Sequence, residues 1–178
     1  MIDTSSIGTS VSRLNEYLGW SDRRLLAVLK KLSDEEFQRE FAPLAGSIHH
    51  KTAHIVSIYV FFQSILEGNP LEQFPDLSHL NRLELIDRWE GIIEQWPNLW
   101  GSNQDKLLPL PLAGNQRVEA REVFVDALLH TVHHRGQILT MVRLLGKDKE
   151  AVHPRDTNLD YLMFLLKQHP EAIYPANN

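Results

Sequence analysis

The chain of 178 residues has 43% hydrophobic residues, 18 basic and 23 acidic side chains, and no cysteine. Its length and apolar content predict one domain over residues 1–178 with a hydrophobic core, and they exclude a mostly disordered chain. The lack of cysteine excludes disulfides, cysteine-ligated zinc and a cysteine nucleophile, while a net charge of −5 without a basic block argues against nucleic acid as a partner.

Apolar residues at helical spacing predict two helices in the first part of the chain. The first is expected over residues 10–32, where leucines recur at intervals of three, four or seven. Ser33 followed by Glu36 forms a capping box that starts a new turn. A second helix is expected from Ser47 to Leu66, because Gly68-Asn69-Pro70 ends it.

A third helix is expected to begin after a cap at either Ser78 or Asn81. It runs to about Trp96, where Pro97 kinks or ends it. Residues 102–118 are predicted to be non-helical and to form a short hairpin or covering loop, because their prolines confine any strand to an edge.

The fourth helix is predicted over residues 119–145, ending at Gly146, and a short helix over residues 158–168. The tail from Tyr174 is expected to fray. Four long helices and one short helix predict an all-α fold, a four-helix bundle with a short extra C-terminal helix. The non-helical loop between helices three and four leaves room for a crossover.

The fourth helix carries two histidines one turn apart. His130 and His134 lie about 40° apart around the helix axis, beside its apolar face, so the pair is predicted to point into the core. His133 lies on the flank, about 60° to the other side, and Arg135 is predicted to face away. The sequence leaves three roles open for His133: a residue that supports the metal ligands, a catalytic acid or base, or a surface residue.

The second helix carries another histidine on its apolar face, His54, with His50 one turn earlier. Two helices therefore direct imidazoles at the bundle interior, and a divalent metal ion is the simplest partner for three of them. The alternative is a set of core histidines hydrogen-bonded to protein groups. The other four histidines are expected to be solvated: His49, His79, His153 and His169.

Two polar residues lie within about 40° of the His130 face, namely Asp126 and Gln137. Each either accepts a hydrogen bond from an imidazole N–H, without binding the metal ion itself, or is hydrogen-bonded only to water at the open end of the bundle. Trp89, Trp96 and Trp100 are expected to pack in the core.

No stretch of the sequence favours export, a membrane or a common catalytic motif. The longest uncharged apolar stretch, residues 55–66, is shorter than the roughly 18–20 residues that cross a bilayer. The first residues, Met-Ile-Asp-Thr-Ser-Ser, lack the features of a signal peptide. HExxH, Gly-x-Ser-x-Gly, P-loop and GxGxxG motifs are absent from the sequence. We therefore expect a soluble, cytoplasmic protein.

Four segments in consistent order follow a known family pattern between residues 13 and 165. They are residues 14–32, Gly46-Ser47-Ile48 with Thr52-Ala53-His54-Ile55, Leu129-His130 through His133-His134-Arg135-Gly136-Gln137-Ile138 to Gly146, and Thr157-Asn158-Leu159-Asp160-Tyr161. Together they resemble the DinB-like (YfiT-like) metal-binding four-helix bundle family.

The resemblance implies a bundle, often a homodimer, that binds nickel, zinc or a similar divalent metal ion through His54, His130 and His134. His50 has no counterpart in the family pattern and is expected not to be a ligand. Family members include bacillithiol transferases, which act on low-molecular-weight thiols, and mycothiol-dependent maleylpyruvate isomerases. Many other members have no assigned reaction.

Two functions from different classes follow. The first is a metal-dependent enzyme, a thiol transferase or a hydrolase acting on a small-molecule substrate. Any nucleophilic sulfur must then come from a thiol cosubstrate, since the chain has no cysteine. His133, Asp126 and Gln137 are the candidates to move protons or orient ligands, and the loop around Gly114 is expected to border the pocket. The second is a non-catalytic bundle that holds a closed metal site or none and acts in stress response through protein interaction.

Overall fold

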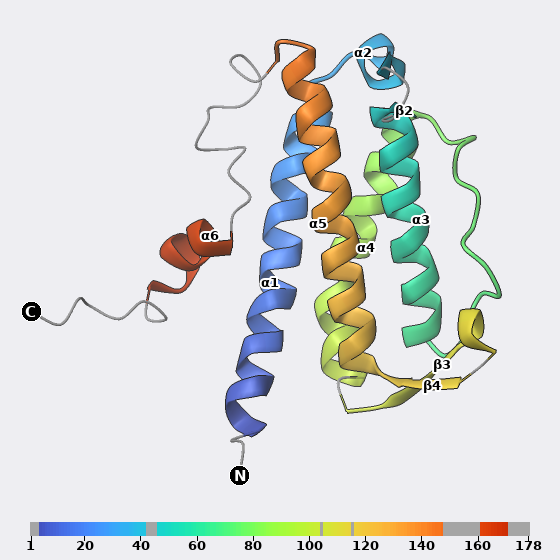
Figure 1. The fold of residues 1–178 in the computed structure, drawn as a ribbon, viewed down its shortest axis with the longest axis vertical. Helices are drawn as coiled ribbons and strands as arrows, with labels where there is room; N and C mark the ends of the chain where they lie inside the picture. Colours follow the sequence, from blue (N-terminus) through green and yellow to red (C-terminus); the bar gives the residue numbers. More distant parts are fainter. Residues whose placement is uncertain (1–3, 42–45, 104, 115, 148–160, 171–178) are drawn as a thin grey trace, which may run out of the picture.

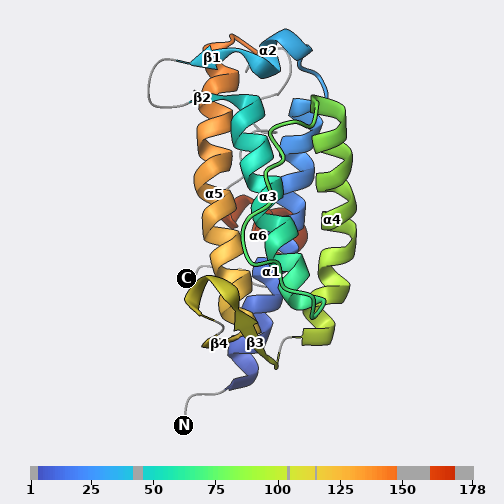
Figure 2. The same cartoon turned by 90° about the vertical axis from the view of Figure 1, so that its right-hand side faces the viewer.

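The protein, seen in a computed structural model, is described over residues 4–41, 46–103, 105–114, 116–147 and 161–170. Within these ranges the elements are, in chain order, α1 (Thr4–Leu29), α2 (Asp34–Gln38), β1 (Glu40–Phe41), β2 (Gly46–Ser47), α3 (Ile48–Leu66), α4 (Arg82–Asn103), β3 (Leu107–Leu110), a 3-10 turn (Pro111–Ala113), β4 (Gln116–Glu119), α5 (Ala120–Leu144) and α6 (Tyr161–Gln168). The helices α1, α3, α4 and α5 lie side by side along the longest axis (Figures 1 and 2), which confirms the predicted all-α bundle with a short extra helix.

Side-chain caps determine where several helices begin. Ser33 and Glu36 form the predicted capping box at the start of α2. The Ser47 hydroxyl accepts a hydrogen bond of 3.1 Å from the backbone N–H three residues on, at the start of α3. Asn81 and Glu84 exchange the same reciprocal bonds, of 3.1 and 2.7 Å, before α4. Asn81, and not Ser78, is therefore the cap of α4.

Helix α4 continues through Pro97 to Asn103, so the prediction of an end near Trp96 and of a non-helical segment from residue 102 was wrong. Proline inside a helix removes one hydrogen bond and costs about 3 kcal/mol. Trp96 and Trp100, on either side of Pro97, are both buried against Phe124 of α5, with ring centroids 5.1 and 4.3 Å apart. Burying two indoles offsets the cost of the proline.

The other helix ends lie near the predicted ones. Helix α1 spans Thr4–Leu29 instead of residues 10–32, and α5 ends one residue before the expected Leu145. Gly146 follows with φ 71, a left-handed conformation that glycine adopts without strain. The tail from Tyr174 and residues 158–160 lie outside the described residues.

The connection that runs the length of the bundle joins α3 to α4. Residues 67–81 return along α3 from its last turn to its first (Figures 1 and 2), so α3 and α4 run in the same direction. Among the hydrogen bonds that attach this segment to α3 are one from the Ser57 hydroxyl to the Pro75 carbonyl, at 2.7 Å, and one between His49 Nε2 and the Leu80 carbonyl, at 2.8 Å. The crossover expected between the third and fourth long helices was therefore misplaced.

The segment between α4 and α5 forms the predicted hairpin. Strands β3 and β4 pair antiparallel from Leu107 opposite Glu119 to Leu110 opposite Gln116. Gly114, with φ 64, closes the turn between them. Because this hairpin reverses the chain at one end of the bundle (Figure 1), α4 and α5 are antiparallel and need no crossover.

A buried ion pair lies within the apolar core. The side chain of Arg135, predicted to face away from the core, is only 2% exposed and pairs with Asp22 of α1 at 2.5 Å. The prediction failed because α5 packs against α1 as well as α3, so two of its faces are covered.

No helix in the described part of the chain is long and apolar enough to cross a membrane.

Candidate metal centre

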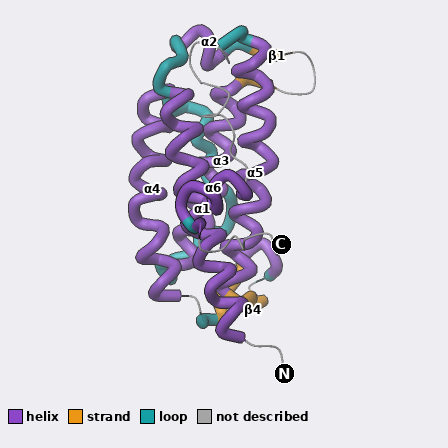
Figure 3. Tube along the Cα trace, turned by 90° about the vertical axis from the view of Figure 1, so that its left-hand side faces the viewer, coloured by secondary structure: helices purple, strands orange, loops and turns teal. Residues whose placement is uncertain are grey.

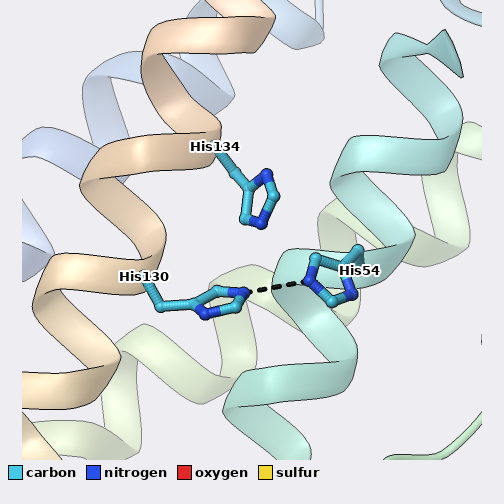
Figure 4. A group of neighbouring side chains, drawn as sticks. All are labelled: His54, His130 and His134. Carbon is cyan, nitrogen blue, oxygen red and sulfur yellow. Dashed lines mark hydrogen bonds between the residues drawn. The ribbon is translucent and has the colours of Figure 1, made fainter. Parts of the chain in front are cut away.

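Three histidine side chains from two neighbouring helices converge at the seam between α3 and α5. Figure 4 shows His54 on α3 facing His130 and His134 on α5. The Nε2 atoms of His54 and His130 are 2.9 Å apart, and the ring centroids of His54 and His134 are 4.7 Å apart. One ring nitrogen from each residue lies within 4.8 Å of the others. This is the only group of three such side chains found among the described residues.

The helices place the three rings by simple geometry. Residues four apart on a helix lie one above the other, so His130 and His134 present two imidazoles along one edge of α5. Helix α3 runs antiparallel beside it (Figure 1) and places His54 opposite the pair (Figure 4). His50, one turn earlier on α3, is exposed and is not part of the group.

All three imidazoles are half-buried, whereas the sequence predicted that the His130 and His134 pair points into the core. Leu129 and Val132, beside the pair on α5, are 63% and 42% exposed. The fully covered side of α5 instead carries Thr131 and Arg135. The group thus lies at the edge of the α3–α5 seam and is partly accessible to solvent.

Gln137 orients the ring of His134. Its Oε1 is 2.8 Å from Nδ1 of His134, and its Nε2 is 3.1 Å from Nε2 of His133. The amide oxygen accepts from His134 Nδ1–H while the amide nitrogen donates to His133, so one amide orientation satisfies both contacts. The proton on Nδ1 leaves the Nε2 lone pair of His134 free to bind a metal ion.

Burial keeps the three imidazoles neutral. Desolvation lowers the pKa of His134 to about 4, and it also lowers the pKa of His54 and of His130 from the ordinary value. For His130 the negative charge of Asp126 acts in the opposite direction and raises the pKa. Near pH 7 all three rings therefore offer lone pairs, which is the protonation state that metal binding requires.

The remaining predicted site residues lie around the group. His133 is exposed on the flank of α5, as expected, and contacts Gln137. Asp126 is exposed one turn before His130 and acts on that ring through its charge, with no hydrogen bond between the two. Gly114 lies in the hairpin at the end of the bundle where α5 begins. His130 is ten residues into α5, about 15 Å along its axis.

Two histidines that were expected to be solvated have protein partners instead. His49 Nε2 is bonded to the Leu80 carbonyl at 2.8 Å, and His169 Nε2 is 2.7 Å from Glu16. The prediction treated helix ends as exposed, but the crossover covers His49 and α1 approaches His169. His79 is exposed as predicted, and His153 lies outside the described residues.

The sequence reasoning missed one buried polar residue of α1, which pairs with the residue directly after His134. Asp22, the partner of Arg135, is completely buried. The signal was present, since Asp22 falls four residues after Leu18 and three before Leu25 on the apolar face of α1. A carboxylate in that position requires a cationic partner.

The fold and the site together define a helical bundle with a group of three histidines that could hold a metal ion. The model of the DinB family matches residues 4–161, and the chain belongs to the DinB family. It is also similar to Protein DinB of Bacillus subtilis (strain 168), with 23% identity over 149 residues, which cover 75% of this chain and 85% of that protein. The family predicted from the sequence segments is thus confirmed.

Proposed function

We propose that His54, His130 and His134 bind one divalent metal ion, nickel or zinc, and that the protein is a metal-dependent enzyme acting on a small molecule. The reaction would be the transfer of a low-molecular-weight thiol or a hydrolysis. The observation that carries this proposal is the convergence of three histidine nitrogens within 4.8 Å at a half-buried seam.

The donor set fits such an ion. Neutral imidazoles suit nickel and zinc, and bonds of 2.0–2.1 Å in tetrahedral geometry place two ligand nitrogens about 3.3 Å apart. His54 and His130 have their Nε2 atoms 2.9 Å apart, and the whole group lies within 4.8 Å. Small side-chain rotations would bring all three to that spacing.

The number of ligands favours catalysis over a closed structural site. Structural zinc sites usually have four protein ligands, whereas catalytic sites have three and an open position. His50, the candidate fourth ligand, is exposed and outside the group. The position facing solvent at the seam would therefore be left for substrate.

Each surrounding residue has a role in this proposal. The ion would act as a Lewis acid and lower the pKa of a bound water or thiol. Gln137 holds the His134 ring in the tautomer that leaves Nε2 free. His133 and Asp126 are exposed beside the group, where they could accept a proton from an incoming thiol or water. The thiol itself would be a cosubstrate, since the chain has no cysteine.

The test is metal content, measured by plasma mass spectrometry on untagged protein. About one ion per chain is expected in the wild type, and its loss is expected in His54→Ala, His130→Ala and His134→Ala with the helical circular dichroism retained. His50→Ala and His79→Ala are matched controls, because both side chains are exposed histidines outside the group. A wild type that stays metal-free after reconstitution with nickel, zinc and manganese would instead support the non-catalytic alternative.

The second stage is activity. Loaded protein would be mixed with bacillithiol and an electrophilic fluorophore, and conjugation would be followed with and without a chelator. Conjugation that the chelator abolishes supports a thiol transferase, and its absence leaves hydrolysis to be screened with ester and amide substrates. We also propose the homodimer suggested by the family pattern, to be measured by sedimentation equilibrium.

A further inference from the structure

A pocket lies away from the three histidines. It has a volume of about 230 Å³, is formed by α1, α3, α4 and α6, and none of the three histidines lines it. We name it the α1–α4–α6 cavity. Figure 3 looks at this side of the bundle, where α6 lies across α1 with α4 beside it.

The walls of the α1–α4–α6 cavity are largely aromatic. Trp20 of α1, Tyr59 of α3, Trp96 of α4 and Phe164 of α6 line it, and Trp20 and Phe164 contact each other edge to face with centroids 5.7 Å apart. An apolar cavity of about 150 Å³ is known to take benzene. A cavity of 230 Å³ with these walls fits a flat molecule of one or two fused rings.

Three charged side chains line the cavity, namely Glu16, Asp22 and Arg23. Asp22 is neutralised by Arg135, and Glu16 is bonded to His169 at 2.7 Å. Arg23 also lines the cavity, is exposed, and has no carboxylate partner among the residues that the structure describes. Arg23 is therefore the charged side chain of the cavity that is left to pair with an anion.

Gly19 lets the guanidinium of Arg23 lie against α1 at the edge of the cavity. A Cβ at Gly19 would be 3.3 Å from Nη2 of Arg23, which is closer than most such contacts, and 3.6 Å from Ile93, which is an ordinary van der Waals distance. Glycine is unfavourable in the middle of a helix. Its presence here gives the charged group a place beside the aromatic walls.

Two further polar atoms of lining residues lack partners. Trp96 Nε1 and Asn15 Oδ1 are buried and have no hydrogen bond in the described structure. Buried polar atoms in native proteins are nearly always paired. A bound molecule with a polar substituent could supply these partners after small side-chain movements.

We propose that the α1–α4–α6 cavity is a binding site for a small aromatic carboxylate of one or two rings. The rings lie between Trp20, Trp96 and Phe164, and the carboxylate is bound by the guanidinium of Arg23, which matches its planar geometry. This site is independent of the histidine group and of the reaction proposed there.

The test is titration calorimetry of the full chain with 1-naphthoate and, as its uncharged counterpart, 1-naphthol. A chelator is present throughout, so that naphthoate bound to a metal ion does not contribute. We expect 1-naphthoate to bind with Kd of about 1 mM or tighter. It should bind roughly three- to tenfold more tightly than 1-naphthol, the factor expected for one charge-assisted contact at a partly exposed site.

Four variants locate the site. Arg23→Gln should abolish the preference for naphthoate over naphthol, while Arg88→Gln, which removes an exposed arginine of α4 outside the cavity, should keep it. Trp20→Ala should weaken both probes. His134→Ala should change neither affinity.

The proposal is overturned by either of two results. One is the absence of saturable naphthoate binding up to about 5 mM. The other is an affinity difference that Arg23→Gln leaves unchanged. Arg23 is exposed, so this variant is expected to fold and the test does not depend on a core substitution.

Discussion

The carboxylate of Asp22 on α1 is paired with the guanidinium of Arg135 on α5, with Oδ1 and Nη1 2.5 Å apart and both side chains almost fully buried. The same carboxylate accepts hydrogen bonds from the hydroxyl of Tyr59 on α3 and from Nε1 of Trp89 on α4. One carboxylate thus joins all four long helices. Arg135 directly follows His134, so this junction also anchors the turn of α5 that carries a candidate metal ligand.

The first prediction concerns removal of the buried charge. Asp22→Asn should lower the free energy of unfolding by about 3–5 kcal/mol, because it leaves the Arg135 guanidinium buried without an opposite charge. Urea denaturation followed by circular dichroism measures this. Asp34→Asn is the matched control, since it breaks the pair between Asp34 and Arg82, in which the aspartate is 75% exposed.

For that exposed pair a loss below about 1 kcal/mol is expected. The double variant Asp22→Leu with Arg135→Met should recover much of the stability, since it removes both charges together. Equal effects of Asp22→Asn and Asp34→Asn would contradict the role assigned to the buried junction.

The second prediction concerns the residue that orients His134. Gln137→Leu should weaken metal binding by about 10- to 100-fold, because it removes the acceptor that holds the Nδ1–H tautomer. Gln137→Glu keeps an acceptor oxygen and should retain most of the affinity. Competition with a chromophoric chelator measures both, and Gln95→Leu, an exposed glutamine of α4, is the control. An unchanged affinity in Gln137→Leu would show that the bond of 2.8 Å does not orient the ring.

The third prediction is a pH dependence of stability in chelator-treated protein. His134 has a pKa of about 4 in the folded state and about 6.5 in the unfolded chain. Between these values the unfolded chain binds the extra proton, so the free energy of unfolding falls as the pH is lowered from about 6.5 towards 4. His54 and His130, whose pKa values are also lowered, add to the same trend.

Equilibrium unfolding at several pH values checks this dependence. His134→Gln should flatten the curve in that window, whereas His79→Gln, at an exposed histidine, should leave it unchanged. The same slope in the wild type and in His134→Gln would contradict the burial effect on this imidazole.

The fourth prediction tests the start of α4. Asn81→Ala should lower stability by about 1 kcal/mol, because it removes the side chain that accepts from the Glu84 backbone N–H. Ser78→Ala, at the other candidate cap, should change stability by less than about 0.5 kcal/mol. Thermal and urea unfolding of the two variants decide between them. A larger loss of stability in Ser78→Ala than in Asn81→Ala would contradict the assignment of Asn81 as the cap of α4.

Local features were predictable from the sequence because the atoms that determine them are close along the chain. The capping box of Ser33 and Glu36, the Ser47 cap of α3 and the end of α5 before Gly146 depend only on neighbouring backbone groups. The facing angle of His130 and His134 depends only on helical geometry. The family predicted from the residue pattern is confirmed, and the three histidines singled out from helical geometry converge in the structure, while their role as metal ligands stays a prediction.

Helical angles describe a residue relative to its own helix, and they do not say which neighbours cover that helix. Arg135 was predicted to be exposed, but α1 covers its side of α5 and supplies Asp22 from a distant part of the chain. Leu80 reaches His49 for the same reason, through a crossover that no local pattern specifies. The helix persists beyond Pro97 because Phe124 buries the tryptophans on both sides.

The helices, most of their caps, the family and the identity of the three converging histidines could be read from the amino-acid sequence, because all of them follow from local geometry or from a pattern of residues. The depth of those histidines, the junction at Asp22 and the α1–α4–α6 cavity became known from the three-dimensional packing. Each of these depends on packing between segments far apart in the chain, where burial changes the free energy of a charge or an aromatic ring.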